Sequence, residues 1–147
     1  MENITLENLY SEEFMNKNMD KLNWKEISSI PNLSEKFIEK YFDKLDLDEI
    51  CFNPNISLKF IDKHSDKLNF ELLELATVGG AGFRNPFSLQ FIAKHADKFN
   101  LEDVFSHHNY STKSLEKVYK KIGIERLKKV IRFLPKEFVK NHIEELK

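Results

Sequence analysis

The sequence predicts an all-α protein, an α-solenoid built from stacked short helix-turn-helix repeats. The first observation behind this prediction is a segment of about 23 residues that recurs along the chain. The second is a helical spacing of apolar residues that occurs twice within each copy. The third is composition, because four glycines and four prolines among 147 residues are too few for a turn-rich β protein.

The repeat divides the chain into about five copies that follow a partial N-terminal copy. Two copies, "LNWKEISSIPNLSEKFIEKYFDK" and "LDLDEICFNPNISLKFIDKHSDK", align without a gap, and the next copy aligns after an insertion is removed. We therefore expect a single domain, residues 1–147, in which neighbouring repeats share a continuous core. The expected repeats are residues 4–21, 22–44, 45–67, 68–98 with the insertion at 77–84, 99–123, and a degenerate copy at 124–147.

The first helix of each repeat is predicted from its N-cap, since an Asn or Asp side chain can accept a hydrogen bond from the first turn. Glu26 and Glu49 stand three positions after such residues, which is the spacing of a capping box. Apolar residues three positions apart then place one face of each helix in the core. The predicted caps are Asn23, Asp46, Asn69 and Asn100, and the apolar pairs are Trp24 and Ile27, Leu47 and Ile50, Phe70 and Leu73, and Leu101 and Val104.

The second helix of each repeat is predicted from a hydroxyl cap with an apolar residue before it and another four residues after it, a hydrophobic staple. A lysine is expected to close this helix, where a cation is favoured. Helices of about eight to ten residues are marginal alone, so each hairpin must pack on the next. The expected caps are Ser34, Ser57, Ser88 and Thr112, the buried positions are Phe37, Phe60, Phe91 and Leu115, and the closing lysines are Lys44, Lys67 and Lys98.

Composition and charge exclude several classes of protein. The first residues do not follow the pattern of a signal peptide, and no apolar stretch approaches membrane-spanning length. The single Cys51 cannot form an internal disulfide and fits a reducing compartment, so we expect a cytoplasmic protein, in the host cytoplasm if it is viral. The net charge of -1 conceals an asymmetry, because residues 1–112 carry 12 basic and 19 acidic side chains and residues 113–147 carry 11 and 5.

The repeat pattern resembles short helical-hairpin repeats found in uncharacterised proteins of giant viruses, phages and AT-rich bacteria. The resemblance covers most of residues 22–123, and Leu72 and the degenerate last copy depart from it. It implies a viral or phage protein and assigns no activity to single residues, because folding explains each motif position. Those positions include Trp24, Pro31, Ser34, Phe37 and Lys40.

The insertion contains the glycine cluster of the sequence "TVGGAGFRNP". A phosphate-binding loop of the Walker type needs a Lys followed by Ser or Thr, and a dinucleotide fingerprint needs a third glycine where Asn85 stands. We therefore expect no nucleotide and no other cofactor. Insertions in solenoids form loops on one face, often the binding face, and Phe83, Arg84 and Phe87 are residue types that interfaces favour. A binding loop and a passive loop both remain open.

The histidines and the cysteine do not predict a metal site or a catalytic centre. His64 and His95 share their repeat position with tyrosines, which indicates a packing position with a polar tip. His107 and His108 are adjacent and have no further ligands at a telling spacing, so no metal is predicted. Cys51 is expected to be a small buried side chain, and a nucleophile would need a positioned base. The sequence therefore favours a protein that is not an enzyme.

The basic segment of residues 113–132 holds eight Lys or Arg and two Glu. These cations are candidates for a stripe that faces phosphates. The alternative is that they coat the solvent face of an end-capping helix, because apolar residues between them keep helical spacing. Lysine dominates over arginine, which argues against bidentate readout. The candidate nucleic-acid residues are Lys117, Lys120, Lys121, Lys128, Lys129 and Arg132.

Four apolar residues stand where other repeats carry polar or small side chains. A contiguous exposed apolar patch would mark an interaction site, whereas scattered residues would seal neighbouring repeats. The four residues are Phe42, Phe52, Leu58 and Leu89.

The function that we predict from the sequence is a non-enzymatic protein-binding repeat module. The resemblance and the divided charge lead to the further hypothesis of a phage or mobile-element inhibitor of a host defence protein, such as an RNA-guided nuclease. The alternative is a nucleic-acid-binding adaptor that uses the basic C-terminal segment, whose affinity would fall steeply with salt. The predicted partner-binding residues are Phe83, Arg84, Phe87, Phe42, Phe52, Leu58 and Leu89.

Overall fold

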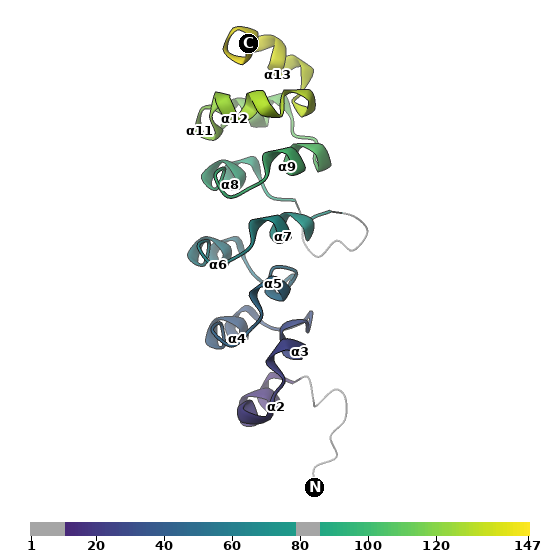
Figure 1. Cartoon of the computed structure of the whole chain (residues 1–147), viewed down its shortest axis with the longest axis vertical. Coiled ribbons are helices and arrows are strands. Elements are labelled where there is room, and N and C mark those ends of the chain that lie inside the picture. The colour runs from purple at the N-terminus through teal and green to yellow at the C-terminus, as the bar shows by residue number, and fades with distance from the viewer. Residues whose placement is uncertain (1–10, 79–85) are drawn as a thin grey trace. The chain divides into compact units, whose positions relative to one another are not determined.

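The computed structural model describes residues 11–78 and 86–147, and the regular elements in these ranges are 13 α-helices and two 3-10 helices (Figure 1). Within these ranges there is no strand, which confirms the all-α prediction. The chain divides into two compact units, which we call the N-terminal unit (Met1–Asn69) and the C-terminal unit (Phe70–Lys147). Within the described ranges, no helix combines the length and the apolar character that crossing a membrane requires.

Each unit contains the short paired helices that the repeat predicts. The elements of the N-terminal unit are α2 (Glu12–Lys17), η1 (Met19–Lys21), α3 (Trp24–Ser28), α4 (Glu35–Lys40), α5 (Leu47–Ile50) and α6 (Leu58–Lys63). The elements of the C-terminal unit are α7 (Phe70–Leu75), α8 (Leu89–Lys94), α9 (Leu101–His107), α10 (Thr112–Glu116), α11 (Tyr119–Ile122), α12 (Ile124–Lys129), η2 (Ile131–Phe133), α13 (Lys136–Asn141) and α14 (Ile143–Leu146).

The helices are shorter than predicted, with four residues in α5 and seven in α9 rather than eight to ten. The second helices end one turn early, because the Tyr or His that follows each of them leaves the helical conformation. The lysines that were expected to close these helices lie over aromatic rings, within the distance of a cation–π contact. Lys44 lies over Trp24 at 5.2 Å, Lys67 over Phe42 at 5.4 Å and Lys98 over Phe70 at 5.9 Å.

The predicted buried face is confirmed in both units. The apolar residues one turn inside the second helices, together with the staple residues on both sides of the caps, are almost completely shielded from solvent. Burying a side chain of this size is worth roughly 1.5–3 kcal/mol, so these positions account for much of the stability of helices that would not persist alone. The residues are Phe37, Phe60, Phe91, Leu115, Leu33, Ile56, Phe87, Ile38, Ile61 and Ile92.

Most of the predicted N-caps are present. Ser34, Ser57 and Ser88 accept hydrogen bonds from the backbone N–H groups of the third residues after them, at 3.1, 3.1 and 3.3 Å. The fourth cap is Ser111 rather than Thr112, because Ser111 has the extended backbone of a cap and accepts from the third N–H. Thr112 is the first residue of the helix itself, so this prediction was wrong by one position.

The backbone N–H groups of several N-cap residues, of first and second helices alike, bond to the preceding repeat rather than within a capping box. Asp46 caps α5 with its side chain, but its own backbone N–H donates to Ser28 Oγ of the preceding repeat at 2.7 Å. That N–H is therefore not available to Glu49, which the sequence placed in a capping box. The N–H of Ser34 likewise donates to Glu12 Oε1 at 2.8 Å, and the N–H of Ser57 donates to Glu35.

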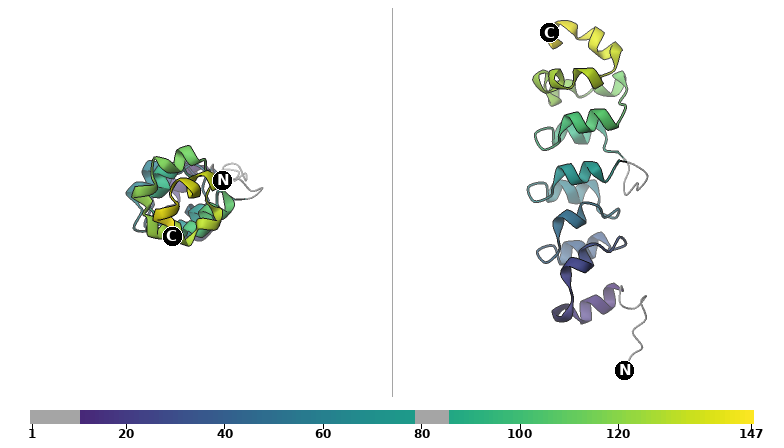
Figure 2. Two further views of the ribbon diagram at one scale, coloured as in Figure 1. Left: turned by 90° about the horizontal axis from the view of Figure 1, so that it is seen from above. Right: turned by 45° about the vertical axis from the view of Figure 1, so that its right-hand side comes forward.

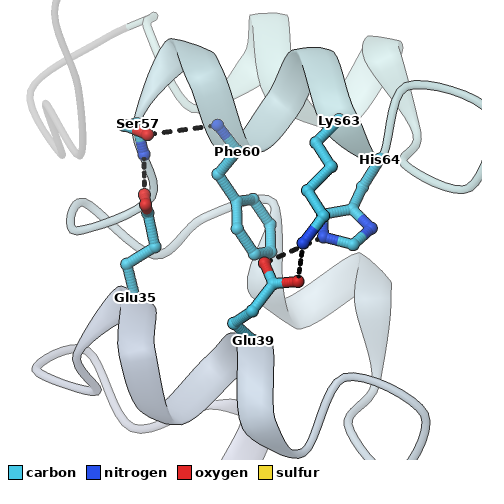
Figure 3. Close-up of polar contacts among 6 residues, drawn as sticks. All are labelled: Glu35, Glu39, Ser57, Phe60, Lys63 and His64. Carbon is cyan, nitrogen blue, oxygen red and sulfur yellow. Dashed lines mark hydrogen bonds and ion pairs between the residues drawn. The ribbon is translucent and has the colours of Figure 1, made fainter.

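Side-chain contacts between α4 and α6, which lie side by side (Figure 2), show how neighbouring repeats are joined within the N-terminal unit. Glu39 accepts from Lys63 and lies 3.0 Å from Nε2 of His64, next to the bond between Glu35 and Ser57 (Figure 3). The side chain of Lys63 holds the pKa of the Glu39 carboxyl below its usual value, with a further contribution from His64. These bonds join residues 22 to 25 positions apart, which is the spacing of one repeat.

These contacts predict that a bond between repeats contributes more than a local capping box. We expect Glu35→Ala to destabilise the N-terminal unit by about 1 kcal/mol, because the Ser57 N–H loses a charged acceptor. Glu49→Ala is the matched control and should cost less than about 0.5 kcal/mol. Urea unfolding followed by the fluorescence of Trp24, the single tryptophan, measures both variants. An equal loss in the two variants would contradict the prediction.

Candidate functional site

The most unusual side chain of the C-terminal unit is Glu74 on α7, a carboxylate that is only 4% exposed. The repeat explains its burial, since the same repeat position holds Ser28, Cys51 and Phe105, which are also buried. An acidic residue thus occupies a position where the other copies carry a small or apolar side chain. A buried charge is costly unless it is paired or hydrogen-bonded.

In the N-terminal unit this repeat position joins one repeat to the N-cap residue of the next. Ser28 Oγ accepts from the N–H of Asp46 at 2.7 Å, and Cys51 Sγ donates to the carbonyl oxygen of Asn69 at 3.6 Å. Glu74 makes no such bond: among the described residues, its two carboxylate oxygens are the only buried side-chain oxygen or nitrogen atoms without a hydrogen-bond partner. Glu74 therefore does not serve the structural role of its counterparts.

The neighbours of Glu74 explain why its carboxylate lacks a donor. The hydroxyl of Thr77 donates its proton to the carbonyl oxygen of Glu74 at 2.7 Å, so Thr77 Oγ1 must accept from His108 Nε2 at 2.9 Å. His108 Nε2 also lies 3.0 Å from Glu74 Oε1. Because this nitrogen carries one proton and that proton points to Thr77, the short distance to Glu74 is a contact rather than a hydrogen bond.

Burial is the main cause of the pKa shifts of Glu74, His108 and Tyr110. Burial raises the pKa of Glu74 to about 7, an increase that His107 opposes and Asp103 reinforces. Burial, together with His107, lowers the pKa of His108, so the imidazole is neutral near pH 7 and does not form an ion pair with Glu74. The pKa of Tyr110 is raised by burial and by the nearby Glu74 charge, and its hydroxyl donates to the carbonyl oxygen of Phe87 at 3.1 Å.

A cleft of about 270 Å³, which we call the acidic cleft, lies between α7 and α9 and has Glu74 in its lining. Leu75 stands on its rim and is 53% exposed, the most exposed large apolar side chain in the described ranges. The predicted insertion starts at the end of α7, but Thr77 is buried and hydrogen-bonded and belongs to the helical scaffold. The cleft is lined by Glu71, Leu72, Glu74, Leu75, Asp103 and His107.

A larger hollow of about 700 Å³ lies in the N-terminal unit, and Met15, Leu22, Ile27 and Ile30 are among its lining residues. It is the larger of the two, but chemistry favours the acidic cleft. None of the residues that line the larger hollow has a buried polar atom without a hydrogen-bond partner, within the part of the chain that is described. The acidic cleft, in contrast, is lined by Glu74, whose two carboxylate oxygens have no hydrogen-bond partner among the described residues.

The residues predicted to contact a partner differ in how exposed they are. Phe83 and Arg84 lie outside the described residues, so the structure says nothing of them. Leu58 is 47% exposed on α6, and Phe52 is half-buried. Phe42 and Leu89 are buried, so of the two interpretations of the unusual apolar residues they follow the one in which such residues seal neighbouring repeats. Phe87 is buried as well, as a staple residue before its cap.

The basic residues of α10 to η2 are mostly exposed, as either interpretation of the basic segment requires. Two of them are paired with acids, since Lys128 Nζ lies 2.8 Å from Glu125 and Arg132 contacts Glu102. Lys128 is half-buried, which reduces its access to a phosphate. Two of the six candidate cations are therefore already paired with acidic side chains. The exposed candidates are Lys117, Lys120, Lys121, Lys129 and Arg132.

The packing interpretation of the repeat histidines is confirmed. The ring of His64 stacks on Phe42 at 4.0 Å, and the ring of His95 contacts Phe70 and Phe91 at 5.2 and 4.8 Å. Cys51 is completely buried, as expected. Over residues 11–78 and 86–147, no group of three or more His, Cys, Asp or Glu side chains is arranged to hold a metal ion.

Sequence reasoning missed Glu74, His108 and Leu75, although the repeat alignment contained a signal for two of them. Glu74 is a charged residue at a position that the alignment predicts to be buried. Leu75 occupies the same repeat position as Phe52, which the alignment did single out. The proximity of His108 had no sequence signal, because it depends on how α7 and α9 pack.

Comparisons with known proteins do not assign the chain to a class. No protein-family model matches the sequence, and no curated protein or solved structure matches it. The resemblance to viral and phage repeats therefore stays a prediction.

Proposed function

We propose that the protein is a non-enzymatic protein-binding repeat module whose contact surface surrounds the acidic cleft. One observation carries the proposal: exposed Leu75 lies beside a carboxylate, Glu74, that has no hydrogen-bond partner among the described residues. An apolar anchor next to an unsatisfied buried acceptor is the arrangement that a partner completes, since burying both groups in an interface removes their cost.

The predicted solenoid is part of this proposal. Both units contain hydrogen bonds between residues that are about one repeat apart in the sequence. Examples are the bond between Glu39 and His64 and the bond of 2.9 Å between Glu116 and His142. Such bonds support a stack of equivalent hairpins. Stacked repeats present extended surfaces for proteins. A cytoplasmic location fits the single buried thiol.

The surface is tested by two matched leucine variants. We expect Leu75→Glu to reduce capture of the native partner at least about tenfold, because an anchor at the centre of an interface contributes 1–2 kcal/mol or more. Leu58→Glu is the control, since Leu58 is also about half exposed and a glutamate stands at its position in another repeat. The measurement is quantitative affinity capture from nuclease-treated lysate of the native host.

Two results would contradict the proposed surface. Loss of the partner in Leu58→Glu but not in Leu75→Glu would place the interface in the N-terminal unit. Recovery of nucleic acid instead of protein, with an affinity that falls steeply with salt, would favour the adaptor function of the basic segment. The pairing of Arg132 and Lys128 with acidic residues supports the protein partner over that alternative.

A finer proposal concerns the partner. The resemblance to phage and giant-virus repeats and the divided charge support an inhibitor of a host defence protein, such as an RNA-guided nuclease. A cleavage assay at saturating concentration of this protein tests it, and full nuclease activity under that condition would reject the inhibitor function while leaving the binding module untouched.

A further inference from the structure

We infer that the acidic cleft receives an arginine side chain of the partner, whose guanidinium group binds the Glu74 carboxylate while an adjacent apolar residue contacts Leu75. This inference rests on the proposed function and specifies the chemistry of the partner at that surface. The occupant is a protein segment with an arginine next to an aliphatic side chain.

Charge complementarity is the first argument. Three of the six residues that line the cleft are acidic, Glu71, Glu74 and Asp103, and His107 is the single basic one. Coulomb attraction is stronger near a partly buried carboxylate than in bulk water, because the effective dielectric constant is lower. The cleft therefore favours a cation over a neutral or anionic group.

The number of free acceptors is the second argument. Both carboxylate oxygens of Glu74, Oε1 and Oε2, lack a hydrogen-bond partner among the described residues. A guanidinium group donates two parallel N–H bonds to the two oxygens of one carboxylate, whereas an ammonium group acts as a single point of charge. Two adjacent unsatisfied oxygens thus fit arginine better than lysine.

The route to the carboxylate is the third argument. The oxygens of Glu74 are covered in the free protein, so Glu74 must rotate its side chain toward the cleft when the arginine binds. This rotation breaks no side-chain hydrogen bond of the carboxylate, although it ends the 3.0 Å contact between Glu74 Oε1 and His108 Nε2. The bonds of Thr77 to the Glu74 carbonyl and to His108 involve other atoms and can remain.

The neighbouring titratable groups predict how the affinity depends on pH. Glu74 must be ionised to bind the cation, and burial sets its pKa at about 7. Below this pH the carboxyl is neutral and attracts a cation less; the other charged or titratable groups that face it are Glu71, Asp103, His107 and His108. We expect the affinity to rise about tenfold from pH 6 to pH 8, the change in the ionised fraction of such a group.

The test uses the full chain, labelled with nitrogen-15, and the probe peptide acetyl-Leu-Arg-Leu-amide. We expect millimolar peptide to shift the backbone NMR signals of Leu75, Thr77 and His108, with an affinity at least about tenfold weaker for Glu74→Gln. A peptide with citrulline in place of arginine has the same shape without the charge and should not bind. Circular dichroism of Glu74→Gln shows that the variant is folded.

The outcomes are decisive and separate the inference from the proposed function. Three results would overturn the inference: the citrulline peptide binds as well as the arginine peptide, Glu74→Gln binds the arginine peptide as well as the wild type does, or no peptide shifts the signals. If a peptide with lysine in place of arginine binds equally well, the choice of a guanidinium group is overturned. If the native partner is lost with Leu75→Glu but kept with Glu74→Gln, the binding surface stands and the arginine site fails. If Leu75→Glu keeps the partner, the proposed function fails.

Discussion

Phe87→Ala is expected to destabilise the C-terminal unit by about 3–5 kcal/mol, the usual cost of removing a buried phenylalanine ring. Phe87 is 3% exposed, and its ring centroid lies 5.1 Å from that of Phe91 and 5.5 Å from that of Phe99. Removing the ring leaves a cavity between these two aromatic side chains. Urea unfolding followed by far-ultraviolet circular dichroism measures the loss.

This result would decide between two roles for Phe87. The sequence predicts Phe87 both as a staple residue and as a partner-contact residue, and on an exposed contact surface its truncation would leave stability unchanged within about 0.5 kcal/mol. Leu75→Ala is the matched control, because Leu75 is exposed and its truncation should change the free energy of unfolding by no more than this amount. A stable Phe87→Ala protein, or an equally destabilised Leu75→Ala protein, would show that the assignment of core and surface is wrong.

Glu74→Gln is expected to make the protein more stable than the wild type at pH 8 by about 2 kcal/mol and to leave it unchanged below pH 4.5. The native carboxyl has a pKa of about 7 instead of 4.5, so between these two values the native state holds a proton that the unfolded state has lost. Stability therefore falls as the pH rises through this window, by at most about 3 kcal/mol. Glutamine resembles the neutral form and removes this penalty.

The comparison is made as urea unfolding of both proteins at several pH values from 4 to 8. Two other groups titrate in the wild type and in the variant alike. Hydrogen bonds to Glu145 and Glu116 raise the pKa of His142, so its contribution to the free energy of unfolding is lost as the pH rises. Burial lowers the pKa of His108, so its contribution to the free energy of unfolding is lost as the pH falls. A difference between Glu74→Gln and the wild type that stays constant from pH 4 to pH 8 would exclude a raised pKa of Glu74.

Much of the fold could be predicted because its signals are local and repeated. Serine caps, staples and apolar spacing occur within a few residues, and a repeat shows each of them several times, as at Ser34, Ser57 and Ser88. The lengths of the helices could not be predicted in the same way. They end at Tyr41, His64 and His95, whose rings also contact aromatic rings outside their own helices, and those contacts belong to the packed state. The outside rings are Trp24, Phe42 and Phe70.

The candidate site, in contrast, depended more on the packing of the helices than on local sequence signals. The alignment singled out Phe42 and Leu89, but an apolar residue at an unusual repeat position either seals a junction between repeats or stays exposed, and only packing distinguishes the two. Glu74 and Leu75 were visible as departures from the repeat, yet the cleft beside them depends on α7 and α9, whose residues are about 30 positions apart.

By itself, the sequence determined that the protein is helical, where each repeat begins, and which face of each helix is buried, because these properties follow from hydrogen bonds and apolar spacing within one turn or two. Only the tertiary structure decided that the N–H groups of Asp46 and Ser57 are satisfied by the preceding repeat and that Glu74 is left without a donor. The physical reason is that a buried polar group must find its partner across the packing interface, and the distance across that interface is not encoded in local spacing.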